Sequence, residues 1–582
     1  MNKIFITGAT GFIGHKLVQK LLEKQDEGEA LELYCLIRDP KKIPAPLLSR
    51  ITVLKGDHAN LHEHRHIIEG CHYIFHVGAR SKLGDGVAYQ ADNVDFTREL
   101  VAIAEAATNL KRFVFTSSIG AVDRAVDDDC NRPLSEESLS NPQSDYGRSK
   151  RLCEEILQSS MLPYIIVRPT WVYGPGMRND SHIRVFIEAV IHGKLFTKIN
   201  FPGNVSLIHV DDLVDALIFL AHHSASVRET YFATDSLRIS IGALFKLIGQ
   251  MTGIKAGMIE VGCGIPLLMR KFRNYFPITV QNLFSDVLCA TGEKLASLGY
   301  SPRRDHCAGI YETVHWHCQE KERIQGRRVR QAVVTGGASG IGKAVCRLLY
   351  AYGYEITIID RDIQMAQEAA YPLNAQVYAA DLSVDAEINQ VVQYLQDRAG
   401  EIDVLVNNAG VGKRGCFSDS NPQDVWAMMK VNCIAPMLAT RAVLESFLQS
   451  AQTKTIINVA SSAAYQPLPY MAVYAASKAS LLSFSDAITG ECMRSKGSHV
   501  EIISVSPSGT ATNFQLSAGV KNEDAGKLLS AEEVASVIFA FIGRGSRSVI
   551  IGTSGKGMAV IARLLPKKMQ ILLWEKLMRA LR

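Results

Sequence analysis

Short apolar runs rich in β-branched residues alternate with longer helical patterns along the whole chain. The runs are apolar throughout, which is typical of parallel strands that helices cover on both faces. In the first half, strands are expected at Ile4–Thr7, Leu33–Ile37, Ile51–Leu54, Tyr73–His76, Phe113–Thr116 and Tyr164–Val167. In the second half, they are expected at Gln331–Thr335, Glu355–Ile359, Gln376–Ala379, Val404–Val406, Thr455–Val459 and Val500–Val505.

Two segments of the sequence recur at the same distance. The glycine-rich segment Thr7–Gly14 returns as Thr335–Gly342, and Tyr146 with Lys150 returns as Tyr474 with Lys478; both repeats are 328 residues apart (335 − 7 and 474 − 146). A chain of 582 residues is also too long for one hydrophobic core. Repetition on this scale predicts tandem domains.

Each glycine segment follows a strand and precedes a helix. Glycine is needed where the chain turns with positive φ and where backbone approaches a pyrophosphate closely. The free N–H groups at the start of a helix then bind phosphate. The predicted fold class is therefore α/β, with two tandem Rossmann-type doubly wound parallel-sheet domains.

A charged, glycine-containing stretch between the halves marks the expected domain boundary. The first domain would span residues 1–320 and end in a substrate cap, with 321–330 as the linker. The second domain would span 331–562, and residues 563–582 would form a basic amphipathic helix.

Composition narrows the class of protein. Hydrophobic residues make up 47% of the chain and charged residues 21%, as in ordinary soluble domains. The net charge of +5 is expected to be spread over the chain, and no nucleic-acid-reading motif is found, so no nucleic-acid partner is expected. We find no secretory signal and no apolar run near the roughly 20 residues that a membrane span needs.

The 12 cysteines form no CxxC pair, which is typical of free thiols in a reducing compartment, so a cytoplasmic location is expected. One group of potential zinc ligands has poor spacing and lies in a segment with a helical pattern, so no metal is expected. Its members are His306, Cys307, His315, His317 and Cys318.

The end of the second strand in each half distinguishes NAD from NADP. Arg38 in the first half suits a 2′-phosphate, which favours NADP(H), although Asp39 argues against it. Asp360 lies 18 residues after Gly342 (360 − 342), where a carboxylate binds ribose hydroxyls and repels a phosphate. NAD(H) is therefore expected in the second half, although Arg361 weakens that preference. Alternatively, these are solvated loop charges.

The second half resembles the shorter, single-domain branch of the short-chain dehydrogenase/reductase family over nearly its whole length. The motifs that carry this resemblance are Thr335–Gly342, Asp381, Asn407–Gly410, Lys430–Asn432, Asn458–Ser462, Tyr474–Lys478 and Pro507–Thr512. One departure is Ser508, which interrupts the usual Pro-Gly.

The first half resembles the extended branch of the same superfamily, and most of all the 3β-hydroxysteroid dehydrogenase group, with dihydroflavonol reductases and sugar-nucleotide epimerases as near relatives. Gly78 stands where relatives often have Ala. The motifs are Gly56-Asp57, His76–Ala79, Asn93-Val94, Thr116–Ser118, Tyr146–Lys150, Arg168-Pro169, Val172–Gly176, His209–Asp212 and Leu298–Pro302.

A hydride transfer to a carbonyl needs a proton on the same oxygen, and a free tyrosine with a pKa near 10 is a poor base. A lysine four residues later lies on the same helix face and favours the phenolate. The resemblance implies that the tyrosines are the acid/base groups, the lysines tune them and the serines hold the substrate oxygen. These residues are Ser118, Tyr146 and Lys150 in the first half, and Ser461, Tyr474 and Lys478 in the second, where Asn432 would hold a proton-relay water.

The resemblance also implies the residues that bind the nucleotide. In the first half they are Gly8, Thr10, Gly11, Phe12, Ile13, Gly14, Arg38, Asp57 and Gly78. In the second half they are Gly336, Ser339, Gly340, Ile341, Gly342, Asp360, Asp381, Asn408, Ala409, Gly410, Pro507 and Thr512.

The C-terminal stretch Leu564–Arg582 has apolar residues at helical spacing and basic residues between them. Such a helix could lie on a membrane surface, pack on the other domain or form a dimer contact, with packing favoured. Membrane contact would point to apolar substrates. The substrate cap is expected at about Asp180–Phe201 and at 234–317 in the first domain, and a lid at Phe514–Lys527 in the second.

These observations predict a bifunctional NAD(P)-dependent oxidoreductase that interconverts carbonyls and alcohols of lipid- or sterol-like small molecules. Three alternatives stay open: a fatty acyl-CoA and aldehyde reductase pair, an epimerase or isomerase fused to a dehydrogenase, and one domain acting only as a cofactor-binding module. Relatives of the second half often pair through helices, so a homo-oligomer is an expectation from the resemblance.

Overall fold

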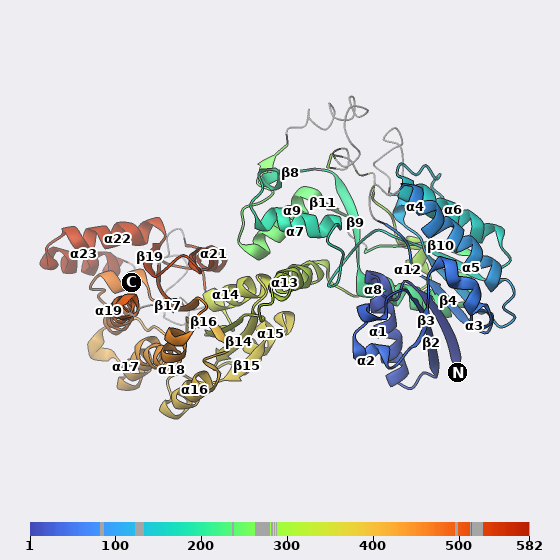
Figure 1. Cartoon of the computed structure of the whole chain (residues 1–582). Coiled ribbons are helices and arrows are strands. Elements are labelled where there is room, and N and C mark those ends of the chain that lie inside the picture. Colours follow the sequence, from blue (N-terminus) through green and yellow to red (C-terminus); the bar gives the residue numbers. More distant parts are fainter. Residues whose placement is uncertain are drawn as a thin grey trace. The chain divides into compact units, whose positions relative to one another are not determined.

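The computed structural model describes residues 1–81, 86–122, 133–235, 238–261, 280, 283–284, 286, 288–494, 499–512, 514 and 528–580. The chain divides into two compact units (Figure 1): residues 1–250 with 255–313, and residues 251–254 with 314–582. The division at residue 313 falls within α13 (His306–Ile324), so the first residues of the predicted linker 321–330 are helical. The predicted domain limits otherwise stay a prediction.

The first unit contains a seven-stranded parallel sheet in the order β10-β6-β5-β4-β1-β2-β3. The strands are β1 (Asn2–Thr7), β2 (Leu31–Ile37), β3 (Thr52–Lys55), β4 (Tyr73–His76), β5 (Arg112–Thr116), β6 (Tyr164–Pro169) and β10 (Glu229–Ala233). The helices around them are α1 (Phe12–Asp26), α2 (Ala45–Leu48), α3 (Arg65–Glu69), α4 (Gly86–Tyr89), α5 (Phe96–Ala104), α6 (Asp145–Ser159) and α8 (Val210–His222).

Helices cover both faces of this sheet. Helices α1 and α8 contribute Leu17 and Leu213 to one buried cluster, and α5 and α6 contribute Leu100 and Leu157 to the other. The predicted cap segments contain α7 (His182–Ile191), α9 (Ile241–Thr252), α12 (Glu293–Ser297), β8 (Ile199–Asn200), β11 (Arg238–Ser240) and β12 (Ile259–Glu260). The strands β7 (Trp171–Tyr173) and β9 (Asn204–His209) lie outside those segments. Parts of the predicted cap lie outside the described residues.

The second unit repeats the plan with the sheet order β15-β14-β13-β16-β17-β18-β19, again parallel. The strands are β13 (Gln331–Thr335), β14 (Glu355–Asp360), β15 (Gln376–Ala379), β16 (Ile402–Asn407), β17 (Lys454–Val459), β18 (Val500–Pro507) and β19 (Arg547–Ile551). The helices are α14 (Gly340–Ala351), α15 (Ile363–Ala370), α16 (Asp385–Arg398), α17 (Pro422–Met429), α18 (Ala435–Gln449), α19 (Ala472–Arg494), α21 (Ala531–Phe541), α22 (Thr553–Leu564) and α23 (Lys567–Ala580).

Both sheets confirm the predicted fold class, and each predicted strand lies on an observed one. The sequence reading missed the edge strands β10 and β19, which pair on one side only. In each sheet the strand order reverses beside the first strand, between β1 and β4 and between β13 and β16. Ligands of doubly wound sheets bind at this point, outside the carboxyl ends of the strands.

One helical stretch, Pro422–Gln449, is long and apolar enough to cross a membrane by length and composition alone. It comprises α17, a π-helical turn and α18, and 56% of its most apolar window is buried within the protein. Its residues Ala439, Val443 and Phe447 belong to the core cluster of the second sheet. We therefore interpret it as a core helix.

A buried ion pair joins α6 to the end of β6 in the first unit. The guanidinium of Arg168 donates to both carboxylate oxygens of Glu154, at 2.9 and 2.7 Å, and Ser117 donates to the same carboxylate at 2.6 Å. Both charged side chains are almost fully buried. The pair therefore fixes the helix that carries Tyr146 against the sheet.

We predict that Glu154→Gln lowers the free energy of unfolding of the first unit by about 3 kcal/mol, because it leaves the Arg168 charge buried without a counter-ion. Glu155→Gln on the same helix breaks only an exposed pair with Arg151 and should cost less than about 0.5 kcal/mol. Denaturant unfolding of both variants measures the difference, and equal losses would contradict the prediction.

Candidate active sites

The glycine loop of the second unit makes a close approach to the neighbouring strand end. Gly336 has a φ of +66°, and a Cβ there would lie 2.9 Å from Cα of Ala409. A Cβ on Gly342 would lie 2.1 Å from the carbonyl oxygen of Gly336. Helix α14 begins at Gly340 with its first N–H groups turned to the loop. Only glycine fits at these points, so the loop offers bare backbone to a phosphate.

Asp360 lies at the end of β14 and is fastened to this loop. Its carboxylate accepts hydrogen bonds from the backbone N–H groups of Ala338 at 3.0 Å and Asp362 at 3.2 Å. Asp381 follows β15 in the same way, accepting from Ser383 N–H at 2.8 Å. Both carboxylates line one cavity with the exposed Arg361. A fixed carboxylate at this position suits a ribose hydroxyl.

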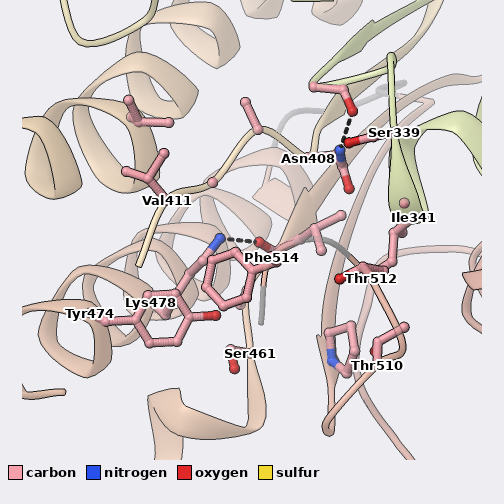
Figure 2. A pocket seen from close by; sticks show the side chains of 18 of the residues that line it. Ser339, Ile341, Asn408, Val411, Ser461, Tyr474, Lys478, Thr510, Thr512 and Phe514 are labelled. Atoms are coloured by element: carbon pink, nitrogen blue, oxygen red, sulfur yellow. Dashed lines mark hydrogen bonds between the residues drawn. The ribbon is translucent and has the colours of Figure 1, made fainter. Parts of the chain in front are cut away.

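The tyrosine and lysine of α19 meet the end of β17 in the same cavity (Figure 2). The Lys478 ammonium donates to the carbonyl oxygen of Val459 at 2.8 Å, and burial lowers the pKa of Lys478 to about 8. Burial raises the pKa of Tyr474, whereas a hydrogen bond with Ser461 lowers it. Ser461 also accepts from Ala463 N–H at 3.2 Å, which holds its hydroxyl at the start of a short helical turn.

Asn432 lies in the π-helical turn Lys430–Ile434 and binds protein groups. Its amide donates to Val411 O at 2.8 Å and to the Ser477 hydroxyl at 3.0 Å, and its oxygen accepts from Val411 N–H at 2.8 Å. The side chain therefore positions Val411, which lines the cavity. The predicted water-holding role of Asn432 stays a prediction.

The cavity has a volume of about 550 Å³, within the range of small-molecule and cofactor sites. The predicted residues that line it are Gly336, Ser339, Gly340, Ile341, Asp360, Asp381, Asn408, Ala409, Gly410, Ser461, Tyr474, Lys478, Pro507 and Thr512. Two predicted residues, Gly342 and Asn432, are not among the residues that line the cavity. The sequence reading missed the apolar lining residues Val411, Leu468 and Met471. Phe514, whose ring centroid is 5.3 Å from that of Tyr474, was predicted only as the start of a lid; the rest of that lid, to Lys527, lies outside the described residues.

The first unit builds the same loop with a closer approach. Gly8 has a φ of +76°, and a Cβ there would lie 2.5 Å from Cα of Gly78. The Gly78 N–H donates to the Thr7 hydroxyl at 3.2 Å. Gly14 packs against Gly8 as Gly342 packs against Gly336. The glycine at position 78 thus follows from the crowding at the loop. The other predicted loop residues, Thr10, Gly11, Phe12 and Ile13, span the turn into α1.

The tyrosine and the lysine of the first unit are placed like those of the second. The Lys150 ammonium donates to Thr116 O at the end of β5, at 2.7 Å, and burial lowers the pKa of Lys150 to about 8. Burial raises the pKa of Tyr146 to about 12, while a hydrogen bond with Ser118 acts the other way. Ser118 accepts from Gly120 N–H at 3.1 Å. Serine, tyrosine and lysine therefore come together in both units.

Asn93 belongs to one of the motifs of the first half, but the sequence predicts no role for it. It lies in a π-helical turn, Gln90–Asp95, like Asn432. Its amide donates to Arg80 O at 3.1 Å and to the Ser149 hydroxyl at 3.0 Å, and its oxygen accepts from Arg80 N–H at 2.8 Å. The same three bonds surround Asn432. Asn93 lies 53 residues before Tyr146 (146 − 93) and Asn432 lies 42 residues before Tyr474 (474 − 432), so the 328-residue repeat does not reveal this match.

The remaining predicted residues of the first unit lie at strand ends. Arg38 is exposed just after β2, and the neighbouring Asp39 carboxylate accepts from Lys41 N–H at 3.1 Å. Asp57 follows β3 and accepts from Ala59 N–H at 3.0 Å. Asp39 is thus engaged as a cap, and both it and Arg38 are exposed.

The predicted zinc-ligand candidates, from His306 to Cys318, all lie on the helix α13, as expected from the helical pattern. Among the residues that the structure describes, no group of three or more His, Cys, Asp or Glu side chains could hold a metal ion.

Comparison with known proteins finds a different family model that matches each half of the chain. Residues 4–233 match the family model of the NAD dependent epimerase/dehydratase family, and residues 330–522 match that of short chain dehydrogenase. A short chain dehydrogenase of Pseudocercospora fijiensis is 34% identical over 184 residues, which are 29% of this chain and 57% of that protein. An uncharacterised oxidoreductase of Staphylococcus epidermidis is 33% identical over 178 residues, which are 30% of this chain and 76% of that protein.

Among solved structures, UDP-N-acetylglucosamine 4-epimerase from Methanobrevibacter ruminantium is 19% identical with a TM-score of 0.45, covering 55% of this chain and 99% of that one. The two family models cover the glycine loop and the tyrosine-lysine pair of each half.

The close approach at the second glycine loop leads to a binding prediction. Gly336→Ala should weaken NADH binding by about tenfold or more, because alanine is strained at positive φ and its Cβ meets Ala409. Gly400→Ala, where a Cβ meets no atom within 4 Å, is the matched control. Calorimetric NADH titration of both variants tests this, and an unchanged affinity in Gly336→Ala would contradict it.

Proposed function

The chain belongs to the short-chain dehydrogenase/reductase superfamily and is an NAD(P)-dependent oxidoreductase, and from that premise we propose that both of its units are active enzymes. Each would interconvert a carbonyl and an alcohol, and the whole chain would be bifunctional. The substrates would be apolar small molecules.

One observation carries this proposal: the same buried lysine contact occurs twice. Lys150 donates to the last carbonyl of β5 and Lys478 to the last carbonyl of β17, at 2.7 and 2.8 Å. Each lysine lies four residues after a tyrosine whose hydroxyl interacts with a serine. Burial of a charged lysine is costly. A unit that only bound nucleotide would not need such a buried lysine beside a tyrosine.

The residues of the second unit suggest a division of labour. A bound nicotinamide nucleotide supplies or accepts the hydride. The Ser461 hydroxyl would hold the substrate oxygen, and the Tyr474 hydroxyl would donate its proton to that oxygen during reduction or take it back during oxidation. The Lys478 ammonium would stabilise the Tyr474 phenolate. Ser118, Tyr146 and Lys150 would act in the same way in the first unit.

We extend the proposal to cofactor preference. The exposed Arg38, beside an aspartate already engaged as a cap, supports NADP(H) in the first unit. The fixed Asp360 supports NAD(H) in the second, because a carboxylate repels a 2′-phosphate. Arg361 lines the same cavity and would moderate that preference.

Apolar substrates are supported by the part of the cavity next to Tyr474. Val411, Leu468, Met471 and Phe514 line it with hydrocarbon and aromatic surface. Such a lining binds a hydrophobic carbonyl compound of lipid or sterol type better than a polar one. A cytoplasmic location beside a membrane and self-association belong to the same proposal.

A second candidate function concerns the first unit alone. Its match to the NAD dependent epimerase/dehydratase family favours an epimerase or dehydratase that regenerates its own nucleotide. Such a unit would retain its nucleotide and consume none over a complete cycle, whereas a dehydrogenase consumes one per turnover.

We predict that Tyr146→Phe abolishes an NADPH-linked activity and Tyr474→Phe an NADH-linked one, each with little effect on the other. Removing the hydroxyl removes the proton donor without changing the ring, and such groups contribute about 10² to 10⁴ in rate. Consumption of both nucleotides against ketosteroids, long-chain aldehydes, acyl-CoAs and sugar nucleotides measures this.

The panel separates the alternatives as well. Turnover of acyl-CoA to aldehyde in one unit would favour the acyl-CoA and aldehyde reductase pair. Conversion of a sugar nucleotide without net nucleotide consumption would favour the epimerase. If either phenylalanine variant leaves every activity unchanged, that unit is not the enzyme proposed here.

The pKa of Lys478, lowered to about 8 by burial, predicts a pH dependence. The ammonium is present below this pKa and is lost above it, so kcat/KM for NADH-linked reduction should fall as the pH rises through about 8. A pH profile of the whole chain measures this, with Tyr146→Phe as background to remove the first unit. A flat profile between pH 7 and about 9 would contradict the assigned role of Lys478.

A further inference from the structure

The last two helices form a hairpin, here called the C-terminal hairpin, which consists of α22 (Thr553–Leu564) and α23 (Lys567–Ala580). The side chain of Gln570 donates to Ala562 O at 2.6 Å and to Leu565 O at 2.7 Å. It thereby caps the end of α22 from the first turn of α23. The hairpin is held as a unit by this buried amide.

The inner side of the hairpin packs on the second unit. Trp574 is buried, and Met578 packs against the apolar cluster that contains Met471 and Tyr474. Met578 O accepts a hydrogen bond from the Arg414 guanidinium at 2.9 Å. The sequence reading left open whether this segment packs or lies on a membrane, and its inner side does pack, on its own unit.

The outer side carries apolar side chains that no described residue covers. On α22, Gly557, Val560, Ile561 and Leu564 follow the spacing of one helix face. The large exposed apolar residues of the hairpin are Val560 (54% exposed), Ile561 (37%), Leu564 (77%), Met569 (54%), Ile571 (46%), Leu572 (61%) and Leu577 (46%). Seven large apolar side chains exposed on two adjoining helices are more than single scattered ones, and a gathering of this kind marks an interaction site in a folded domain.

The charge of the chain gathers on the same hairpin. Residues 553–582 contain seven of the 63 lysines and arginines and one of the 58 acidic residues, so the rest of the chain has 56 basic and 57 acidic side chains. The prediction that the net charge is spread over the chain is therefore wrong, because the surplus of basic residues lies at the end of the chain. Arg563, Lys567 and Lys568 are exposed around the turn, beside Leu564 and Met569.

We propose that the outer side of the C-terminal hairpin is a docking surface for an anionic lipid bilayer. Apolar side chains flanked by exposed lysine and arginine are what an interfacial helix needs, with hydrocarbon entering the headgroup boundary and cations at the phosphate level. A second copy of the chain is the weaker occupant, because a two-fold contact through this surface would bring the exposed Arg563, Lys567 and Lys568 of one copy near the same residues of the other.

The docked hairpin would lie next to the cavity of the second unit. Met578 on its inner side contacts the cluster to which Met471 and Phe514 contribute, and both line the cavity. A membrane at the outer side would then bring dissolved apolar substrates near Tyr474. This last step rests on the proposed function, whereas the docking itself does not.

The test is flotation of the full chain with vesicles, without substrate or nucleotide. The protein should float with phosphatidylcholine vesicles that contain phosphatidylserine, far less with phosphatidylcholine alone, and should be released by high salt. Lys567→Gln with Lys568→Gln should lower the bound-to-free ratio on the order of 25-fold, about fivefold per charge. Leu564→Asp with Leu572→Asp should abolish flotation.

Matched controls give each outcome a meaning. Met493→Asp places the same charge on a side chain that is 72% exposed in the same unit but outside the hairpin, and it should float like the wild type. Tyr474→Phe should float normally too, so loss of its turnover with intact flotation bears on the proposed function alone. The proposal is overturned if the wild type stays unbound by anionic vesicles, or if the paired hairpin variants float as it does. If the paired hairpin variants float like the wild type but have a lower molar mass than it does in light scattering, the surface contacts a second copy of the chain.

Discussion

A lysine ammonium buried against the last carbonyl of a central strand is the constraint around which each unit is organised. Desolvation of the charge is costly, and the contact with Val459 O or Thr116 O offsets part of that cost. The helix must therefore cross the carboxyl edge of the sheet at one height and one rotation. That placement brings the tyrosine, one turn earlier, over the serine at the same strand end.

The glycine loops depend on the same sheet edge from the other side. Gly336 and Gly8 approach the backbone of the adjacent strand end so closely that a side chain would displace it. The glycine loops and the serine, tyrosine and lysine side chains thus share one edge of the sheet, at the point where the strand order reverses. Asn93 and Asn432, in the π-helical turns, each donate a hydrogen bond to the serine hydroxyl one residue before the lysine, that of Ser149 or Ser477. This shared geometry explains how two sequences with different relatives retain the same arrangement.

The two units differ where the fold leaves freedom. By strand register, Arg38 stands where the second unit has Arg361, and Ile37 stands where it has Asp360, so the second unit adds a carboxylate at this strand end without a change in the sheets. The first unit carries α7 between β6 and β10 and α9 after β10, whereas the second ends in the C-terminal hairpin. In folds of this kind, loops and appended elements at the carboxyl edge determine which substrate is bound and where the protein is located, because their backbone is not hydrogen-bonded into the sheet.

The sequence by itself determined both sheets, both glycine loops and both Tyr-Lys pairs, because each is encoded by residues close together in the chain: an apolar run, a glycine turn, two side chains one helical turn apart. It did not reveal the edge strands β10 and β19, although it did reveal the opposite edge strands β3 and β15. Only the tertiary structure decided that Asn93 forms the bonds of Asn432, that Met471 and Phe514 flank Tyr474, and that one side of α23 is buried while the other is exposed. Those facts depend on residues distant in sequence that meet when helices settle on the sheet, and no local pattern specifies which face of a helix finds a partner.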